Sequence, residues 1–103
     1  MNNNLKEDGQ LQIELSAEVA QGTYANLALI THSTAEFVLD FIRVMPGLEK
    51  ASVKSRVILT PEHAKRLMFA LQDNIRKYEE KNGPIQVEKG TYAAPFPGVG
   101  GEA

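Results

Sequence analysis

The segment from Thr60 to Gly83 constrains the fold most, because it carries both a start signal and a stop signal for a helix. Thr60 suits the N-cap position, and Pro61 follows at the first helical position, where proline's missing N–H leaves no hydrogen bond unmade. Gly83 and Pro84 then end the pattern, as a helix cap and a helix breaker do. The sequence therefore predicts a long helix that begins at Pro61 and stops at Gly83.

The apolar residues of this helix recur at helical spacing and form a single stripe, with charged residues on the other sides. Phe69 is an aromatic residue on the polar side, and we expect it to pack under the tail or against a second protomer. Asn74 lies on the flank of the stripe, where a buried amide needs a partner such as a backbone group at the sheet edge. The stripe consists of Ala64, Leu67, Met68, Leu71, Ile75 and Tyr78.

Four segments upstream of the helix show the alternation or the apolar runs typical of β-strands. The first, Leu11 to Leu15, alternates cleanly between apolar and polar residues. A polar turn at residues 31–34 and a Met-Pro-Gly turn at residues 45–47 separate the later ones. These are Thr23 to Thr31, Ala35 to Val44 and Lys50 to Leu59. We predict an α+β fold, in which an antiparallel sheet of about four strands (a β-meander) is followed by one long C-terminal amphipathic helix.

The middle strands differ from the first because they carry apolar residues on both faces. In the fourth strand, alternation places Val53, Val57 and Leu59 together. A helix of about 22 residues is roughly 33 Å long and 10 Å wide, so it covers one face of a four-stranded sheet and not both. Unless sheet twist hides the second face, it meets another protomer, the chain's own tail or a bound client. The candidate interface residues are Tyr24, Leu27, Leu29, Phe37, Leu39 and Phe41.

Charge and composition exclude several classes of function. The 11 basic and 13 acidic residues give a net charge of −2, which provides no general attraction for nucleic acid or anionic membrane. The absence of cysteine removes disulfides, thiolate metal sites and thiol nucleophiles. The first residues lack the order of a signal peptide, and no apolar run approaches the roughly 20 residues that span a bilayer. We expect a cytoplasmic protein with no membrane partner.

The length of 103 residues allows one domain. Residues 1–9 are polar and we expect them to be flexible. Residues 10–83 would form the single α+β domain. Residues 84–103 are rich in proline and glycine, which is typical of a flexible tail.

No catalytic constellation is visible in the sequence. We interpret His32 and His63, the two histidines, as surface residues rather than metal ligands or bases. Asp40 lies in an otherwise apolar strand, where it is a cross-strand partner of Arg56, an outward edge residue or a perturbed acid at a site; we favour the first two. There is no phosphate-binding loop or catalytic serine motif. We therefore expect no enzyme activity, no catalytic residues, no metal and no cofactor.

Three cations, Lys50, Lys54 and Arg56, lie on or next to the fourth predicted strand. With Tyr24 or Phe37 nearby, they would offer phosphate contacts and stacking surfaces to a single-stranded nucleic acid. The other interpretation, which we prefer, is that strand lysines protect a sheet edge from aggregation.

The stretch RVILTPEHAKRLMFALQDNIRKYEEKNG, residues 56–83, resembles a small bacterial family of unknown function. In that family an arginine-containing strand leads into a Ser/Thr-Pro-x-x-Ala-Lys cap and a helix that ends in Asn-Ile/Leu-x-x-Tyr-Glu before glycine. The upstream AEFVLDFIRVMPG, residues 35–47, is similar to the family's Glu-Phe-x-Leu-Asp-Phe strand. Lys81 and Asn82 depart from the family at the cap, where an aromatic often precedes the glycine. The resemblance spans about residues 11–83 and implies no activity.

The predicted topology is also similar to that of two known groups. Subunits of SecB-type export chaperones tetramerise and bind unfolded chains on apolar grooves, and the purine-rich-element and related single-strand-binding folds dimerise. A shared topology does not decide function. The leading hypothesis is a non-enzymatic homo-oligomeric protein-binding or assembly module, of a chaperone-like kind, that holds an unknown protein partner on apolar sheet surface and on the Tyr92 to Pro97 tail. The alternative is a single-stranded nucleic-acid-binding dimer.

Overall fold

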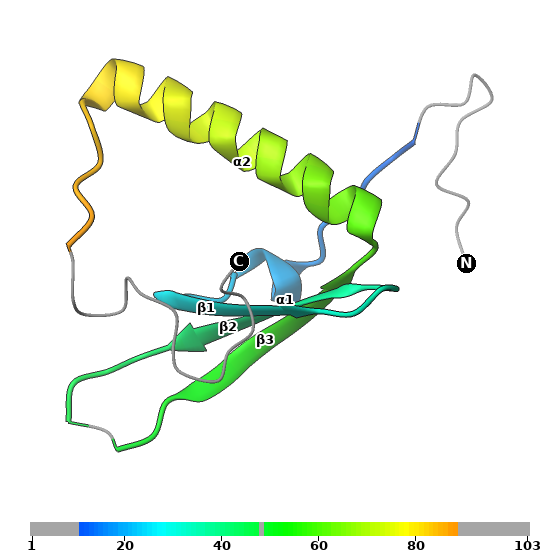
Figure 1. Cartoon of the computed structure of the whole chain (residues 1–103). Helices are drawn as coiled ribbons and strands as arrows, with labels where there is room; N and C mark the ends of the chain where they lie inside the picture. Colours follow the sequence, from blue (N-terminus) through cyan, green and yellow to red (C-terminus); the bar gives the residue numbers. More distant parts are fainter. Residues whose placement is uncertain (1–10, 48, 89–103) are drawn as a thin grey trace.

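The computed structural model describes residues 11–47 and 49–88, and it has the predicted α+β class. Three strands form one antiparallel sheet in the order β1-β2-β3, so β2 is the central strand. Helix α2 leaves the sheet directly after β3 and runs over it as a long separate rod (Figure 1). The elements are α1 (Ala17–Ala20), β1 (Leu27–His32), β2 (Phe37–Arg43), β3 (Ser52–Leu59) and α2 (Pro61–Asn82).

The predicted first strand, Leu11 to Leu15, is not seen. Leu11 makes an isolated bridge, and the next five residues are irregular. They lead into the short helix α1, whose N-cap Ser16 accepts a hydrogen bond from the N–H of Val19 (3.2 Å). The apolar side chains of this segment are exposed, Ile13 to 86%. Alternation favours a half-buried strand, but a strand also needs a neighbour to pair with, and the sheet of the described residues ends at β1.

The register of the sheet defines its two faces. Leu39 of β2 lies opposite Ile30 of β1 and Val57 of β3, and side chains of opposed residues share a face. One face, called face A here, holds Ala28, Ile30, His32, Phe37, Leu39, Phe41, Arg43, Ser52, Ser55, Val57 and Leu59. The other, face B, holds Leu27, Leu29, Thr31, Val38, Asp40, Ile42, Val53, Arg56 and Ile58.

A β-bulge in β3 changes which residues share a face. Phe41 pairs with Ser55 but Ile42 pairs with Val53, so Lys54 is the extra residue. Val53 therefore lies on face B with Ile42. Simple alternation along β3 placed Val53 with Val57 and Leu59, and that prediction is wrong because the bulge depends on the partner strand and not on the local pattern.

The side chain of Asn26 extends the ladder between β1 and β2. Its Nδ2 donates to the carbonyl oxygen of Val44 (3.0 Å), and the N–H of Val44 donates to Asn26 Oδ1 (2.8 Å). The backbone N–H of Asn26 also donates to the carbonyl oxygen of Ile42 (3.0 Å). The amide thus supplies one donor and one acceptor beyond the end of β1, as a further backbone pair would.

The core of the described residues is small and centred on β2. Its buried hydrophobic residues are Leu39 on face A, 8% exposed, and Ile42 on face B, 5% exposed. Both belong to the central strand, which has a neighbour on each side. The edge strands leave large apolar side chains open, among them Ile30 and Ile58.

Helix α2 begins and ends where the sequence predicts. Thr60 Oγ1 accepts a hydrogen bond from the N–H of His63 (3.1 Å), and Pro61 occupies the first turn. At the other end Gly83 has φ 88°, a value that glycine adopts without strain, and its N–H donates to the carbonyl oxygen of Glu79 (2.9 Å). None of the 22 residues of α2 is buried.

Candidate interaction surface

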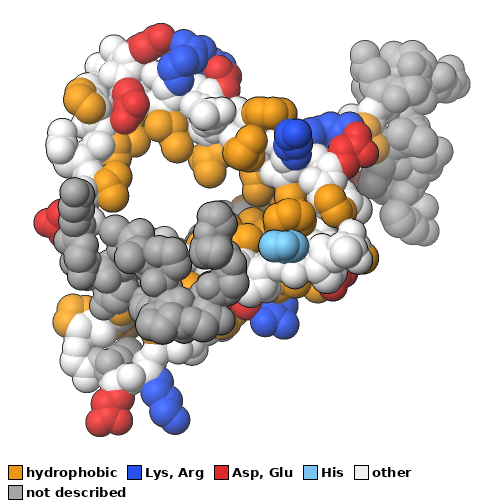
Figure 2. All heavy atoms as spheres, in the orientation of Figure 1, with side chains coloured by type: hydrophobic (Ala, Val, Ile, Leu, Met, Phe, Trp, Pro, Cys, Tyr) orange, Lys and Arg blue, Asp and Glu red, His pale blue; other side chains and the backbone are white. Residues whose placement is uncertain are grey.

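The apolar stripe of α2 faces solvent. Its large side chains are 40–56% exposed, from Ile75 at the low end to Leu71 at the high end. Figure 2 shows hydrophobic side chains along one side of α2, at the rim of an open gap beside the helix. Helix α2 makes no more than marginal contact with any described strand. An amphipathic helix normally buries such a stripe against another element, and the described part of the chain supplies none.

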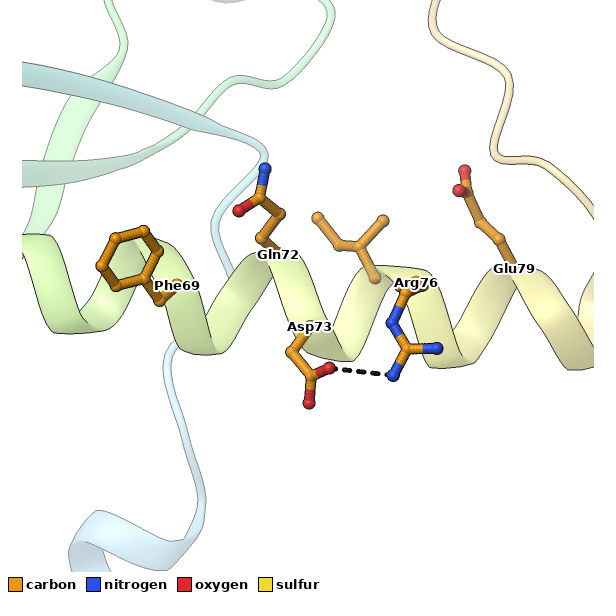
Figure 3. A pocket seen from close by; sticks show the side chains of 6 residues that line it. Phe69, Gln72, Asp73, Arg76 and Glu79 are labelled. Carbon is orange, nitrogen blue, oxygen red and sulfur yellow. Dashed lines mark hydrogen bonds and ion pairs between the residues drawn. The ribbon is translucent and has the colours of Figure 1, made fainter.

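A shallow open depression lies on the flank of α2 (Figure 3). Its lining residues all come from this one helix, so it is a feature of the helix surface and not an enclosed site. Phe69, the aromatic residue on the polar side, lies here and is 53% exposed. The lining comprises Phe69, Gln72, Asp73, Ile75, Arg76 and Glu79.

Ion pairs order the polar side of α2. Arg76 Nη2 donates to Asp73 Oδ1 (3.0 Å), and Lys77 Nζ lies 3.2 Å from Asp73 Oδ2. The hydrogen bond from Arg76, and then that from Lys77, lowers the pKa of Asp73. A sheet-edge partner for Asn74 was suggested above in case its amide is buried. Asn74 is instead exposed, and its Nδ2 donates to the carbonyl oxygen of Ala70 within the helix (2.9 Å). These polar side chains thus find their hydrogen-bond and ion-pair partners within α2, whereas the apolar stripe finds no surface that buries it.

The candidate interface residues of the sheet fall on two faces. Phe37, Leu39 and Phe41 lie on face A, and Leu27 and Leu29 lie on face B. Tyr24 precedes β1 and is 68% exposed. Face A is apolar except at His32, at Ser55 and at the end formed by Arg43 and Ser52, and the ring of His32 stacks on that of Phe37 with centroids 5.2 Å apart. Around Leu39 face A is therefore a continuous apolar surface.

Asp40 forms a cross-strand ion pair, which was one of the two favoured interpretations of its place in an apolar strand. Arg56 Nε donates to Asp40 Oδ1 (2.6 Å) and Arg56 Nη2 to Oδ2 (2.8 Å), a bidentate contact. The hydrogen bonds from Arg56 hold the pKa of Asp40 below its ordinary value of 3.8, against a smaller opposing effect of desolvation. The pair gives face B a fixed polar centre.

The three candidate nucleic-acid contacts are not equivalent. Arg56 is held by Asp40, and Lys54 is the bulged residue of β3. Lys50 lies before β3 and is exposed. Phe37 pairs with Leu59, at the opposite end of β3 from Lys54. The sheet therefore does not bring the cations together around Phe37.

The described residues contain no group of three His, Asp or Glu side chains that could hold a metal ion. His32 ends β1 and His63 lies in the first turn of α2. No helix within residues 11–47 and 49–88 has both the length and the apolar character that a membrane crossing requires.

Comparison with known families comes to one result. The model of the DUF3467 family, described as a protein of unknown function, matches residues 1–87. The chain belongs to this family. The match includes every helix and strand described above. No curated protein and no solved structure matches the chain. Membership of a family of unknown function is thereby confirmed, while the similarity to SecB-type chaperones stays a prediction.

Proposed function

We propose that this chain is a non-enzymatic assembly and protein-binding module that associates with further copies of itself through the apolar stripe of α2 and face A of the sheet. One observation carries the proposal. A capped, amphipathic helix of 22 residues has no buried residue. A helix with so regular a stripe is typical of one that packs against another surface.

The energetics of burial support an intermolecular partner. Each large residue of the stripe is about half exposed, so completing its burial stabilises by roughly 1 kcal/mol. Five such residues on each of two helices give about 10 kcal/mol of burial free energy. This gain is comparable to the free energy that two chains lose in translational and rotational freedom when they associate, so it can offset that loss. In proteins most of the stability of a helix comes from packing of its amphipathic face, which is a second reason for a partner.

The dimensions of the stripe and of face A agree. The stripe from Ala64 to Tyr78 runs about 21 Å along the helix axis. The strands contain six to eight residues, which corresponds to about 20–26 Å. A copy's stripe laid along face A would therefore be covered over its whole length. Client proteins with an apolar segment would use the same surfaces.

The single-stranded nucleic-acid alternative has less support. Arg56 already holds Asp40 in a bidentate contact, and the net charge is −2. Such a binder would lose affinity steeply as salt is raised, whereas apolar assembly would not.

The test is the molar mass in solution, measured by size-exclusion chromatography with light scattering. Wild type should exceed the mass of one chain at micromolar concentration. Leu71→Glu places a charge on the stripe, and we expect it to weaken association at least tenfold.

The matched control is Gln72→Glu, which adds the same charge one residue away and off the stripe. It should keep the wild-type mass, with far-UV circular dichroism confirming that both variants retain the helix. A wild type that stays monomeric at high micromolar concentration would overturn the proposal.

A further inference from the structure

The two edges of the sheet differ in chemistry. The β3 edge carries Lys54, Arg56 and a β-bulge, all devices by which proteins prevent one sheet edge from pairing with another. The β1 edge, LALITH, contains no Lys, Arg, Asp, Glu or Pro, and its register with β2 is uninterrupted. Only one of the two edges is thus protected against a further strand.

The backbone of β1 offers three residues to that open edge. The N–H of Ser33 donates to the carbonyl oxygen of Glu36 (2.9 Å), which makes these two a hydrogen-bonded pair. Antiparallel ladders alternate, so Leu27, Leu29 and Thr31 hydrogen-bond to β2. The alternate residues Ala28, Ile30 and His32 direct their N–H and C=O groups outward. Among the described residues no strand pairs with this edge.

We propose that β1 pairs antiparallel with β1 of a second copy, about a two-fold axis at Ile30, so that two sheets join into one of six strands. In this register Ile30 faces Ile30 of the partner subunit, and Ala28 faces the partner's His32. Every outward N–H and C=O group of the three residues then has a hydrogen-bond partner. The inference rests on the proposed homo-oligomer and specifies which strand joins the copies.

The side chains at the β1 edge and the width of the joined sheet both favour a second copy of this chain as the strand that pairs with β1. Ile30 is 44% exposed on face A, and the junction would bury it against its own counterpart. Face A would also become continuous across the two copies. Six strands are about 24 Å wide, and two α2 helices side by side take roughly 20 Å. The joined face A is thus wide enough for both stripes, whereas a three-stranded sheet is not.

A chain without cysteine allows a direct test by disulfide cross-linking. Opposed residues of a hydrogen-bonded pair have Cα atoms about 5.5 Å apart, within the range that a disulfide bridges. Ile30→Cys should therefore give a covalent dimer on mild oxidation, seen by non-reducing electrophoresis. Ile58→Cys is the matched control, because it replaces an isoleucine that is also exposed on an edge strand, and it should remain a single chain.

A second variant addresses the backbone. Ala28→Pro removes one outward N–H and almost no side chain, so it should weaken association at least tenfold while the β1–β2 ladder survives. Ile58→Pro makes the same change on the β3 edge and should leave the mass unchanged. If Ala28→Pro does not fold, the cross-linking result decides.

The outcomes separate this inference from the proposed function. A monomeric wild type would overturn both. An oligomeric wild type in which Ile30→Cys does not cross-link faster than Ile58→Cys would overturn the β1 junction alone. Preferential cross-linking at position 30, with a loss of mass in Ala28→Pro, supports the junction.

Discussion

Strand β2 and helix α2 are held in place in opposite ways. Strand β2 has a hydrogen-bonded neighbour on each side and contains the two hydrophobic residues that are buried among those the structure describes, Leu39 and Ile42. Helix α2 has both caps, ion pairs on its polar side and no buried residue. The strand is fixed by long-range contacts within the chain, and the helix by contacts within itself.

This difference shows where the folding information for each region lies. A cap typically contributes about 1 kcal/mol and an i,i+4 pair less, so they define where α2 begins and ends but do not stabilise it strongly. Burial of the stripe would supply several times that amount. Within the described residues the sheet buries part of its central strand, whereas α2 has no surface against which to bury its stripe.

The largest expected effect tests the comparison directly. Ile42→Ala removes a side chain that is 5% exposed and should lower the free energy of unfolding by about 3 kcal/mol. Ile75→Ala makes the same change on α2, where the side chain is 40% exposed, and should cost less than about 1 kcal/mol at protein concentrations where the copies are apart. Urea unfolding followed by far-UV circular dichroism measures both. Equal costs under those conditions would show that α2 packs on its own sheet.

The next largest effect is expected at the N-cap of α2, Thr60. Thr60→Ala removes the acceptor for the N–H of His63 and should destabilise the helix by about 1 kcal/mol. Thr60→Ser keeps an oxygen at the same position and should restore most of the loss. The measurement is the helical signal at 222 nm during thermal unfolding. A Thr60→Ala variant as stable as wild type would mean that contacts outside the helix fix its start.

The smallest expected effect is a pH dependence of the folding stability, which should be stronger for the ion pair on face B than for those on the polar side of α2. Because the folded-state pKa of Asp40 is lowered, its pair with Arg56 stabilises the fold above the ordinary pKa of 3.8, and this contribution is lost as pH falls through the folded value. The urea midpoints of wild type and Asp40→Asn should therefore differ near neutral pH and converge in acid.

Asp73→Asn on α2 is the comparison variant for that measurement. The pKa of Asp73 is also lowered, so the sign is the same. Its side chain is 48% exposed against 15% for Asp40, and solvent screens it more, so its effect should be the weaker one. A larger pH effect at Asp73 would contradict the ranking of the two regions.

The elements that follow local rules were predictable from the sequence. The helix was predicted to its ends, because Thr60, Pro61 and Gly83 act on their own backbone neighbours. The two middle strands and the pair of Asp40 with Arg56 were also found. A carboxylate in an apolar strand must be paired or face solvent, and the next strand offered a cation for the pair.

The features that depend on how one strand pairs with another were not predictable from the sequence. Leu11 to Leu15 alternates well but does not join the sheet, since alternation describes side chains and not pairing. The bulge at Lys54 and the ladder contacts of Asn26 arise from the register with β2. The only signal for Asn26 was an amide among apolar residues. The division of the candidate interface between face A and face B likewise needed the register.

The connection between β3 and α2 is a single residue, Thr60, and it is extended with φ −67° and ψ 156°. Because so short a connection leaves only the two backbone dihedral angles of Thr60 to vary, the helix and the strand before it cannot separate far. In the proposed assembly, a copy that binds the helix would therefore also bring the sheet of the same chain close to it.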